Sequence, residues 1–145
     1  MKPRHWLLCV VAILIGLLGN TVLGDCVRVT DILEAIREVE TGGHKDPASA
    51  MGDGGRSRGP MQISRAYFKD AKENNPKLVG VAYEEVSKLS ISYVVVLGYW
   101  NRYGKTFTAE ELCRLHNGGP SKKGTDTYWK KCNAILIKLS IKCKE

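Results

Sequence analysis

The segment from 44 to 60 constrains this chain more than any other, because it cannot form a long helix. It is rich in Gly, Asp, Ser and Pro, and five glycines or prolines fall between Gly52 and Pro60. Glycine costs about 1 kcal/mol in a helix interior and proline about 3 kcal/mol. The segment therefore predicts turns with a short hairpin.

A first helix is indicated directly before this insert. Four apolar side chains recur on one face at helical spacing: Ile32, Leu33, Ile36 and Val39. Asp31, with Glu34 three residues later, matches a capping box that opens the helix. Gly42 and the glycine after it match a helix terminator.

The rest of the chain is patterned mainly for helices. After the insert we expect helices at 64–74, 83–103, 108–115 and 126–140, with a loop at 116–120. The apolar run at 91–100 also fits a buried strand, but its polar flanks favour a helix. The pattern predicts one mostly helical α+β domain spanning 25–145, with a small Gly-rich hairpin or turn region after the first helix.

The first 24 residues have the composition of a secretory signal peptide. A short basic start precedes an apolar run at 6–18, and small or β-branched residues lead to a cleavage site after Gly24. The run is shorter than the roughly 20 residues that span a bilayer, although a membrane anchor is the alternative. We expect a secreted, extracellular protein without stable membrane insertion.

The cysteines agree with secretion. Once Cys9 leaves with the signal, an even number remains for an oxidising compartment: Cys26, Cys113, Cys132 and Cys143. Two disulfides are expected, and all three pairings stay open. Zinc is the alternative, but the chain lacks CxxC and HxxxH spacings, so neither a metal nor another cofactor is expected.

The charge balance favours anionic partners. Removing Lys2 and Arg4 with the signal leaves 20 basic and 15 acidic side chains. A basic secreted protein is attracted to teichoic acids, peptidoglycan or acidic lipid. No nucleic-acid-binding module is evident, so nucleic acid is not an expected partner, and a monomer is expected. Arg56 and Arg58 in the insert could pair with peptidoglycan carboxylates or could be solvated loop charges.

Two carboxylates carry the chemistry that the sequence suggests. Glu40 lies in the last turn of the first helix, where the partial negative charge of the helix end disfavours an ionised carboxylate. A glutamic acid that stays protonated is the proton donor of a glycosidase. Asp53 lies in a polar turn, where it would stay ionised as a nucleophile, stabiliser or base. An exposed glutamate and a turn-forming aspartate are the plainer interpretations.

Four segments together resemble the invertebrate-type (i-type) lysozymes, the family that includes the destabilases. They are 39–43 (VETGG), 59–63 (GPMQI), 116–120 (HNGGP) and 128–129 (YW). The resemblance covers nearly the whole chain after the signal peptide, and 116–120 is its most specific part. It implies a lysozyme-like fold that hydrolyses the β-1,4 bond between N-acetylmuramic acid and N-acetylglucosamine in bacterial peptidoglycan, for antibacterial defence or digestion.

The resemblance also implies residue roles. Its acid glutamate corresponds to Glu40 and its aspartate to Asp53, while Gln62, His116 and Asn117 would lie along the substrate cleft. Counted back from Gln62, however, the family's aspartate falls on Gly52. The family is also dense in disulfides, and this chain keeps only four cysteines after the signal peptide.

Aromatic side chains could stack on sugars, and Tyr128 or Trp129 is the best placed of them near the 116–120 segment. Two other functions stay open. One is a non-enzymatic cationic protein that binds bacterial envelopes. The other is a destabilase-like isopeptidase, which would need a serine beside His116.

Overall fold

The computed structural model describes residues 27–42, 44–73 and 75–142. The predicted signal peptide, Cys26 and Cys143 lie outside these described residues. Helices make up most of the described chain, and three two-residue strands form its sheet. The prediction of a mostly helical α+β class is therefore confirmed.

Helix α2 (Val29–Thr41) carries the first predicted carboxylate, Glu40. Its start differs from the prediction: Asp31 is the third helical residue, and its carboxylate accepts the backbone N–H of Arg28 at 2.8 Å. Glu34 pairs with Arg37 instead of completing a capping box with Asp31. The end is as predicted, because Gly42 adopts φ +53° and closes the helix on the carbonyl of Glu38.

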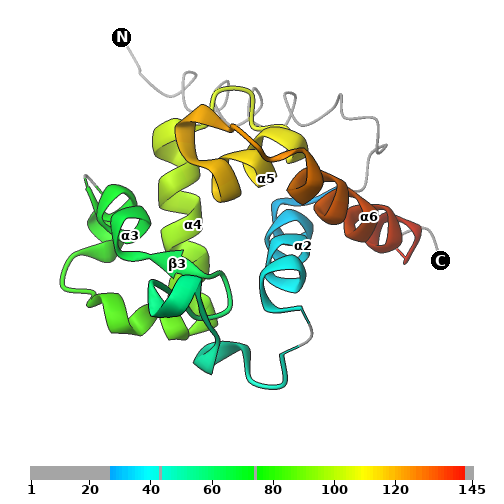
Figure 1. Ribbon diagram of the computed structural model, residues 1–145. Coiled ribbons are helices and arrows are strands. Elements are labelled where there is room, and N and C mark those ends of the chain that lie inside the picture. The colour runs from blue at the N-terminus through cyan, green and yellow to red at the C-terminus, as the bar shows by residue number, and fades with distance from the viewer. Residues whose placement is uncertain (1–26, 43, 74, 143–145) are drawn as a thin grey trace, which may run out of the picture.

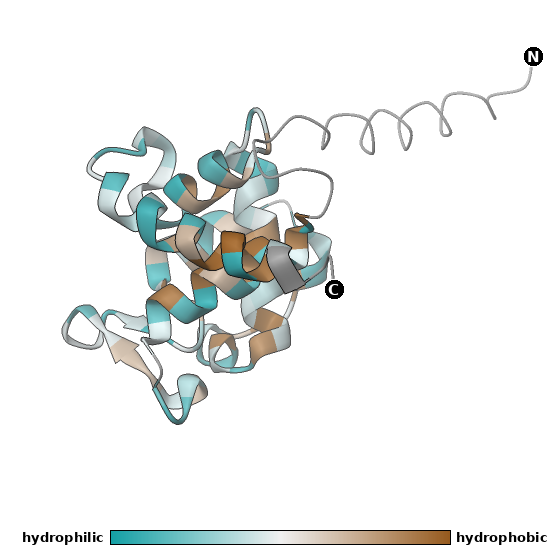
Figure 2. Ribbon diagram, turned by 90° about the vertical axis from the view of Figure 1, so that its right-hand side faces the viewer, coloured by the Kyte–Doolittle hydropathy of each residue, from teal (hydrophilic) through white to brown (hydrophobic). Residues whose placement is uncertain are grey.

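The insert folds into short turns and a small sheet, as its composition predicts. It contains the 3₁₀ turns η1 (Pro47–Ser49) and η2 (Asp53–Gly55) and the strands β1 (Met51–Gly52) and β2 (Ser57–Arg58), and the strand β3 (Ile63–Ser64) follows it. The strands pair antiparallel in the order β1-β2-β3. Figure 2 shows this largely hydrophilic segment at one end of the molecule, away from the apolar helices.

Helix α3 (Arg65–Lys72) follows the sheet and is capped by Ser64, whose hydroxyl accepts the N–H of Tyr67 at 3.2 Å. The single helix expected at 83–103 is divided at Lys88 into the 3₁₀ turn η4 (Tyr83–Ser87) and helix α4 (Leu89–Tyr103). Another turn, η3 (Pro76–Leu78), precedes them. The strand alternative for 91–100 is wrong, because this segment lies within α4.

Helix α5 (Ala109–Gly118) begins as expected, with the Thr108 hydroxyl accepting the N–H of Glu111 at 3.2 Å. It does not end at Leu115. His116 and Asn117 are helical, and the loop expected at 116–120 is replaced by the end of α5 and the turn η5 (Gly119–Ser121). Helix α6 (Asp126–Lys142) completes the described fold.

Helix α4 stands at the centre of the molecule, with α3 on one side and α5 on the other, while α2 packs against α6 (Figure 1). The fully buried side chains come from every helix and from the sheet. They include Ile36, Met61, Ile63, Val95, Val96, Trp100, Leu112, Leu115 and Leu136. Their packing holds the end of α2, the sheet and α5 in fixed relative positions. None of the described helices is long and apolar enough to cross a membrane.

Two of the predicted disulfide cysteines meet in this core. Cys113 of α5 and Cys132 of α6 are fully buried free thiols. A hydrogen bond with Cys132, together with burial, raises the pKa of the Cys113 thiol. With Cys26 and Cys143 outside the described residues, the two disulfides remain a prediction.

Glu111 links the loop before α5 to the turn after it. Its carboxylate accepts the backbone N–H groups of Lys105, Thr106 and Phe107 and the ammonium of Lys122. Burial alone would raise its pKa, but the hydrogen bonds from Lys122 and Thr106 outweigh burial and lower it to about 2. The ionised carboxylate therefore stabilises the fold.

This lowered pKa predicts a specific acid sensitivity. The stabilisation is fully present above the ordinary pKa of 4.5 and is lost as the pH falls toward 2. From pH 5 to pH 2, the free energy of unfolding of the wild type should fall by about 3 kcal/mol more than that of Glu111→Gln. Urea unfolding at several pH values measures this, with Glu110→Gln as the exposed control. The prediction is wrong if the free energies of unfolding of wild type and Glu111→Gln change with pH in the same way.

Candidate functional site

A cleft of about 510 Å³ brings together residues that are far apart in sequence. It contains five of the residues singled out from sequence: Glu40, Asp53, Gln62, His116 and Asn117. The end of α2, the hairpin, α3, α4 and α5 all contribute to its wall. Its other lining residues are Gly52, Ser57, Ser64, Ala66, Tyr67, Asp70, Tyr99 and Gly119.

Glu40 is held firmly in the cleft wall. The hydroxyl of Tyr128, from α6, donates to Glu40 Oε1 at 2.7 Å, and Nε2 of His116 lies 3.5 Å from the same oxygen. The Glu40 side chain is only 18% exposed. Among the described residues none hydrogen-bonds to Oε2, so one carboxyl oxygen stays available to a molecule in the cleft.

His116 supports Glu40 and does not face solvent. Its side chain is 3% exposed, and its Nδ1 lies 3.1 Å from the hydroxyl of Tyr67. Nδ1 therefore faces Tyr67, while Nε2 lies within ion-pair distance of Glu40 Oε1. Both ring nitrogens are therefore engaged, and His116 is suited to orienting Glu40 more than to binding substrate.

Tyr128 differs in the same way from the role expected for it. Its ring was expected to stack on a sugar, but its hydroxyl is bonded to Glu40 and it does not line the cleft. Burial, and next the negative charge of Glu40, raise the pKa of Tyr128, so its hydroxyl stays protonated as a donor. Burial likewise raises the pKa of Tyr67.

Asp53 lines the cleft from the turn η2 and is exposed to solvent. It adopts φ +51°, a left-handed conformation that aspartate tolerates better than most residues. Its Oδ2 accepts the hydroxyl of the buried Ser57 at 3.2 Å, which orients the carboxylate. Asp53 and Glu40 thus have different surroundings: one carboxyl group is exposed and the other is mostly enclosed.

Gln62 has its side chain close to Gly52, the residue before Asp53. Its side-chain amide donates to the carbonyls of Gly59 at 2.8 Å and Ala50 at 3.2 Å. A Cβ atom at Gly52 would lie 2.2 Å from Gln62 Oε1. A side chain at 52 would therefore require the end of the Gln62 side chain to shift, which would disturb these hydrogen bonds. Although Gln62 lines the cleft as expected, its amide group holds the hairpin together.

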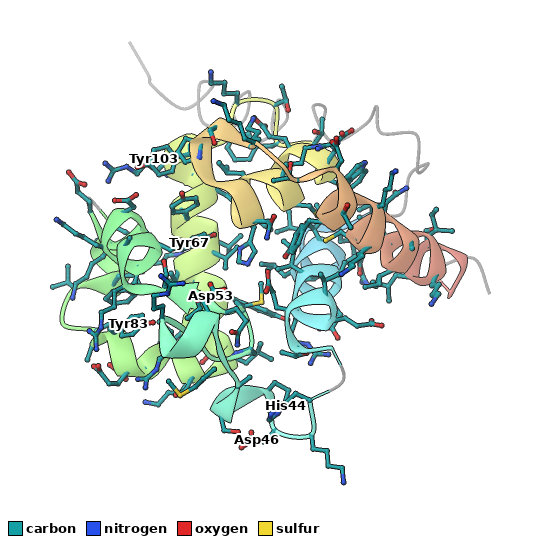
Figure 3. All side chains as sticks on the ribbon, in the orientation of Figure 1. His44, Asp46, Asp53, Tyr67, Tyr83 and Tyr103 are labelled. Atoms are coloured by element: carbon teal, nitrogen blue, oxygen red, sulfur yellow. The ribbon has the colours of Figure 1, made fainter. Side chains whose placement is uncertain are left out.

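The described structure also adds residues that sequence reasoning did not select. Tyr67 stacks on Tyr99 with ring centroids 3.7 Å apart, and Tyr103 donates to Asp70 Oδ2 at 3.1 Å. Figure 3 shows the Tyr67 and Asp53 side chains near the middle of the molecule. The spacing of Tyr67 and Asp70, three residues apart on α3, is a signal that could have placed both on one helix face.

This arrangement suits acid–base chemistry on a bound molecule. An enclosed carboxyl group with a free oxygen can act as a proton donor, and an exposed carboxylate can act as a base, a nucleophile or a charge stabiliser. Within the described residues, no group of three or more His, Cys, Asp or Glu side chains could hold a metal ion. Comparison with models of protein families and with curated proteins finds no match for this chain.

Proposed function

We propose that the chain is a secreted muramidase with a lysozyme-like fold. It would cleave the β-1,4 bond between N-acetylmuramic acid and N-acetylglucosamine of bacterial peptidoglycan. The observation that carries the proposal is the position of Glu40, whose carboxyl group is oriented by Tyr128 and His116 and keeps one oxygen for the cleft. The resemblance of four segments to i-type lysozymes supports the choice of substrate.

In the proposed reaction, Glu40 protonates the glycosidic oxygen as the bond breaks. Charge then develops on the sugar ring, and the exposed carboxylate of Asp53 can stabilise it, attack it or activate a water. Asp70 also lines the cleft, but its Oδ2 accepts the hydroxyl of Tyr103. Ser57 orients Asp53, just as Tyr128 and His116 orient Glu40. The exposed Asn117 offers an amide group for hydrogen bonds to the sugar.

The two alternatives receive less support. An isopeptidase would need a serine activated by His116, but the two ring nitrogens face Tyr67 and Glu40. The hydroxyl of Ser57 donates to Asp53. A cationic envelope-binding protein would not need the ordered carboxylate pair that lines the cleft.

Lysis of cell walls tests the proposal. Native protein should lower the turbidity of a suspension of purified Gram-positive walls and release reducing sugar, and heat-denatured protein should do neither. Bacterial killing by native and denatured protein alike, without release of sugar, would favour the cationic alternative. Hydrolysis of an ε-(γ-Glu)-Lys peptide without release of sugar would favour the isopeptidase.

Asp53→Asn tests the second carboxylate. Asparagine also tolerates the left-handed backbone of position 53, so the hairpin should keep its shape. We expect kcat on soluble glycan to fall about 100-fold while KM changes little, because charge stabilisation acts mainly in the transition state. Ser57→Ala, which removes only the orienting hydroxyl, should cost less than about tenfold. An unchanged kcat for Asp53→Asn would show that Glu40 acts without it.

A further inference from the structure

A second pocket, of about 420 Å³, lies next to the cleft. Three arginines line it: Arg56 and Arg58 from the hairpin and Arg65 from the start of α3. Ser64 and Ala66 line both this pocket and the cleft, so the two share a wall. A polymer bound in the cleft would therefore pass close to this arginine pocket.

Tyr83, which is labelled in Figure 3, also lines the arginine pocket. Its hydroxyl donates to the carbonyl of Ile63 at 2.7 Å, which fixes the ring beneath the hairpin. The guanidinium carbons of Arg65 and Arg58 lie 4.3 Å and 5.5 Å from the ring centroid. Two positive groups thus gather over one aromatic ring, an arrangement that an anion between them would stabilise.

Glu84 balances the positive charges in this pocket only in part. Arg65 pairs with Glu84 at 3.1 Å, but both side chains are mostly exposed, so this pair is weak. Arg56 donates to the backbone carbonyl of Asp53 at 2.9 Å. Arg58 forms no ion pair within the described residues, and its charge interacts at longer range with Glu84, the carboxylate that pairs with Arg65. Guanidinium groups bind carboxylate and phosphate through two parallel hydrogen bonds, so the pocket has unused capacity for an oxyanion.

We propose that the arginine pocket binds an oxyanion carried by the cell-wall polymer while its glycan occupies the cleft. Both a carboxylate of the stem peptide and a phosphate of an attached wall polymer have this chemistry. The proposal rests on the proposed function, because it takes the ligand of the pocket to be part of the cleft's substrate.

Binding of cell walls by a variant that does not cleave them tests the arginine-pocket proposal. In a Glu40→Gln background, the protein is sedimented with insoluble walls that either retain their phosphate polymers or have been stripped of them. Arg58→Gln/Arg65→Gln should raise the Kd for walls about tenfold, through loss of two charge-assisted contacts. Lys130→Gln/Lys131→Gln is the matched control: it removes the same charge from an exposed part of α6 and should change the Kd by less than about twofold.

The two wall preparations identify the source of the anion. If the arginine variant has a tenfold higher Kd on stripped walls, the pocket binds stem-peptide carboxylates. If its Kd is raised only on unstripped walls, the pocket binds phosphate. Equal binding by the arginine variant and the lysine control on both preparations overturns the proposal. If the double variant does not fold, Arg58→Lys/Arg65→Lys keeps the charge and should still weaken binding, because lysine lacks the planar fork.

Cleavage of a neutral oligomer of N-acetylglucosamine separates this proposal from the muramidase proposal. With Glu40 restored, Arg58→Gln/Arg65→Gln should cleave the neutral oligomer as the wild type does. Its KM should be raised only on anionic fragments. Failure to cleave any glycan, with arginine-dependent binding intact, would contradict the muramidase proposal alone. Normal cleavage with no dependence on the arginines would contradict the pocket proposal alone.

Discussion

Glu40→Gln should reduce the rate of glycan cleavage about a thousandfold, because an amide cannot protonate the leaving oxygen. The loss should fall on kcat, since glutamine has nearly the shape of glutamate and leaves the cleft intact. In the wild type the hydroxyl of Tyr128 donates a hydrogen bond to Glu40 Oε1 at 2.7 Å. The carbonyl oxygen of the glutamine can accept the same hydrogen bond. The melting temperature should therefore change little.

Glu38→Gln is the matched control for this variant. Glu38 lies on the same helix α2 but is exposed and does not line the cleft. The same chemical change there should leave both kcat and KM within about twofold of the wild type. A rate for Glu40→Gln within tenfold of the Glu38 control would exclude Glu40 as the acid.

Gly59→Ala should be strongly destabilising, because the new methyl group has no room. Gly59 adopts φ +76°, and a Cβ there would lie 2.4 Å from the backbone carbonyl oxygen of Val86. Its carbonyl also accepts from both the backbone and the side-chain amide of Gln62. The cost of the left-handed backbone and of overpacking together is about 3–5 kcal/mol. The expected fall in melting temperature is on the order of 10–20 °C.

Gly80→Ala separates the cost of the left-handed backbone from the cost of overpacking. Gly80 has nearly the same φ, +77°, but a Cβ there would meet nothing within 4 Å. Only the left-handed backbone is penalised, so thermal unfolding should show a loss of about 1–2 kcal/mol. Equal melting temperatures for the two variants would mean that Gly59 does not pack against Val86 as described.

Short sequence patterns predicted the elements whose structure depends mainly on neighbouring residues. Glycine-rich composition predicted the hairpin, and Gly42 predicted the end of α2 beside Glu40. The local rule failed at His116, where the glycines after it suggested a loop. The helical penalty of Gly118 is about 1 kcal/mol, and burial of Leu115 and His116 in the core outweighs it.

The supporting residues of the candidate site depend on packing between distant segments. Tyr128 is 88 residues from Glu40 in sequence, and His116 is 49 residues from Tyr67. These contacts exist because α6 packs on α2 and because α5 and α3 both face α4, which no local pattern specifies. Sequence therefore selected Glu40, Asp53, His116 and Tyr128 as site residues. The role of His116 and Tyr128 in orienting Glu40, in place of binding substrate, required the three-dimensional arrangement.

The most direct test of the central claim is the identity of the new ends formed when purified peptidoglycan is digested. Fragments released by the wild type are analysed by mass spectrometry after reduction of their reducing ends. If Glu40 acts as proposed, each fragment carries a reduced N-acetylmuramic acid, and Glu40→Gln forms almost none. Fragments that end in N-acetylglucosamine, or cleaved peptides on intact glycan, would contradict the account.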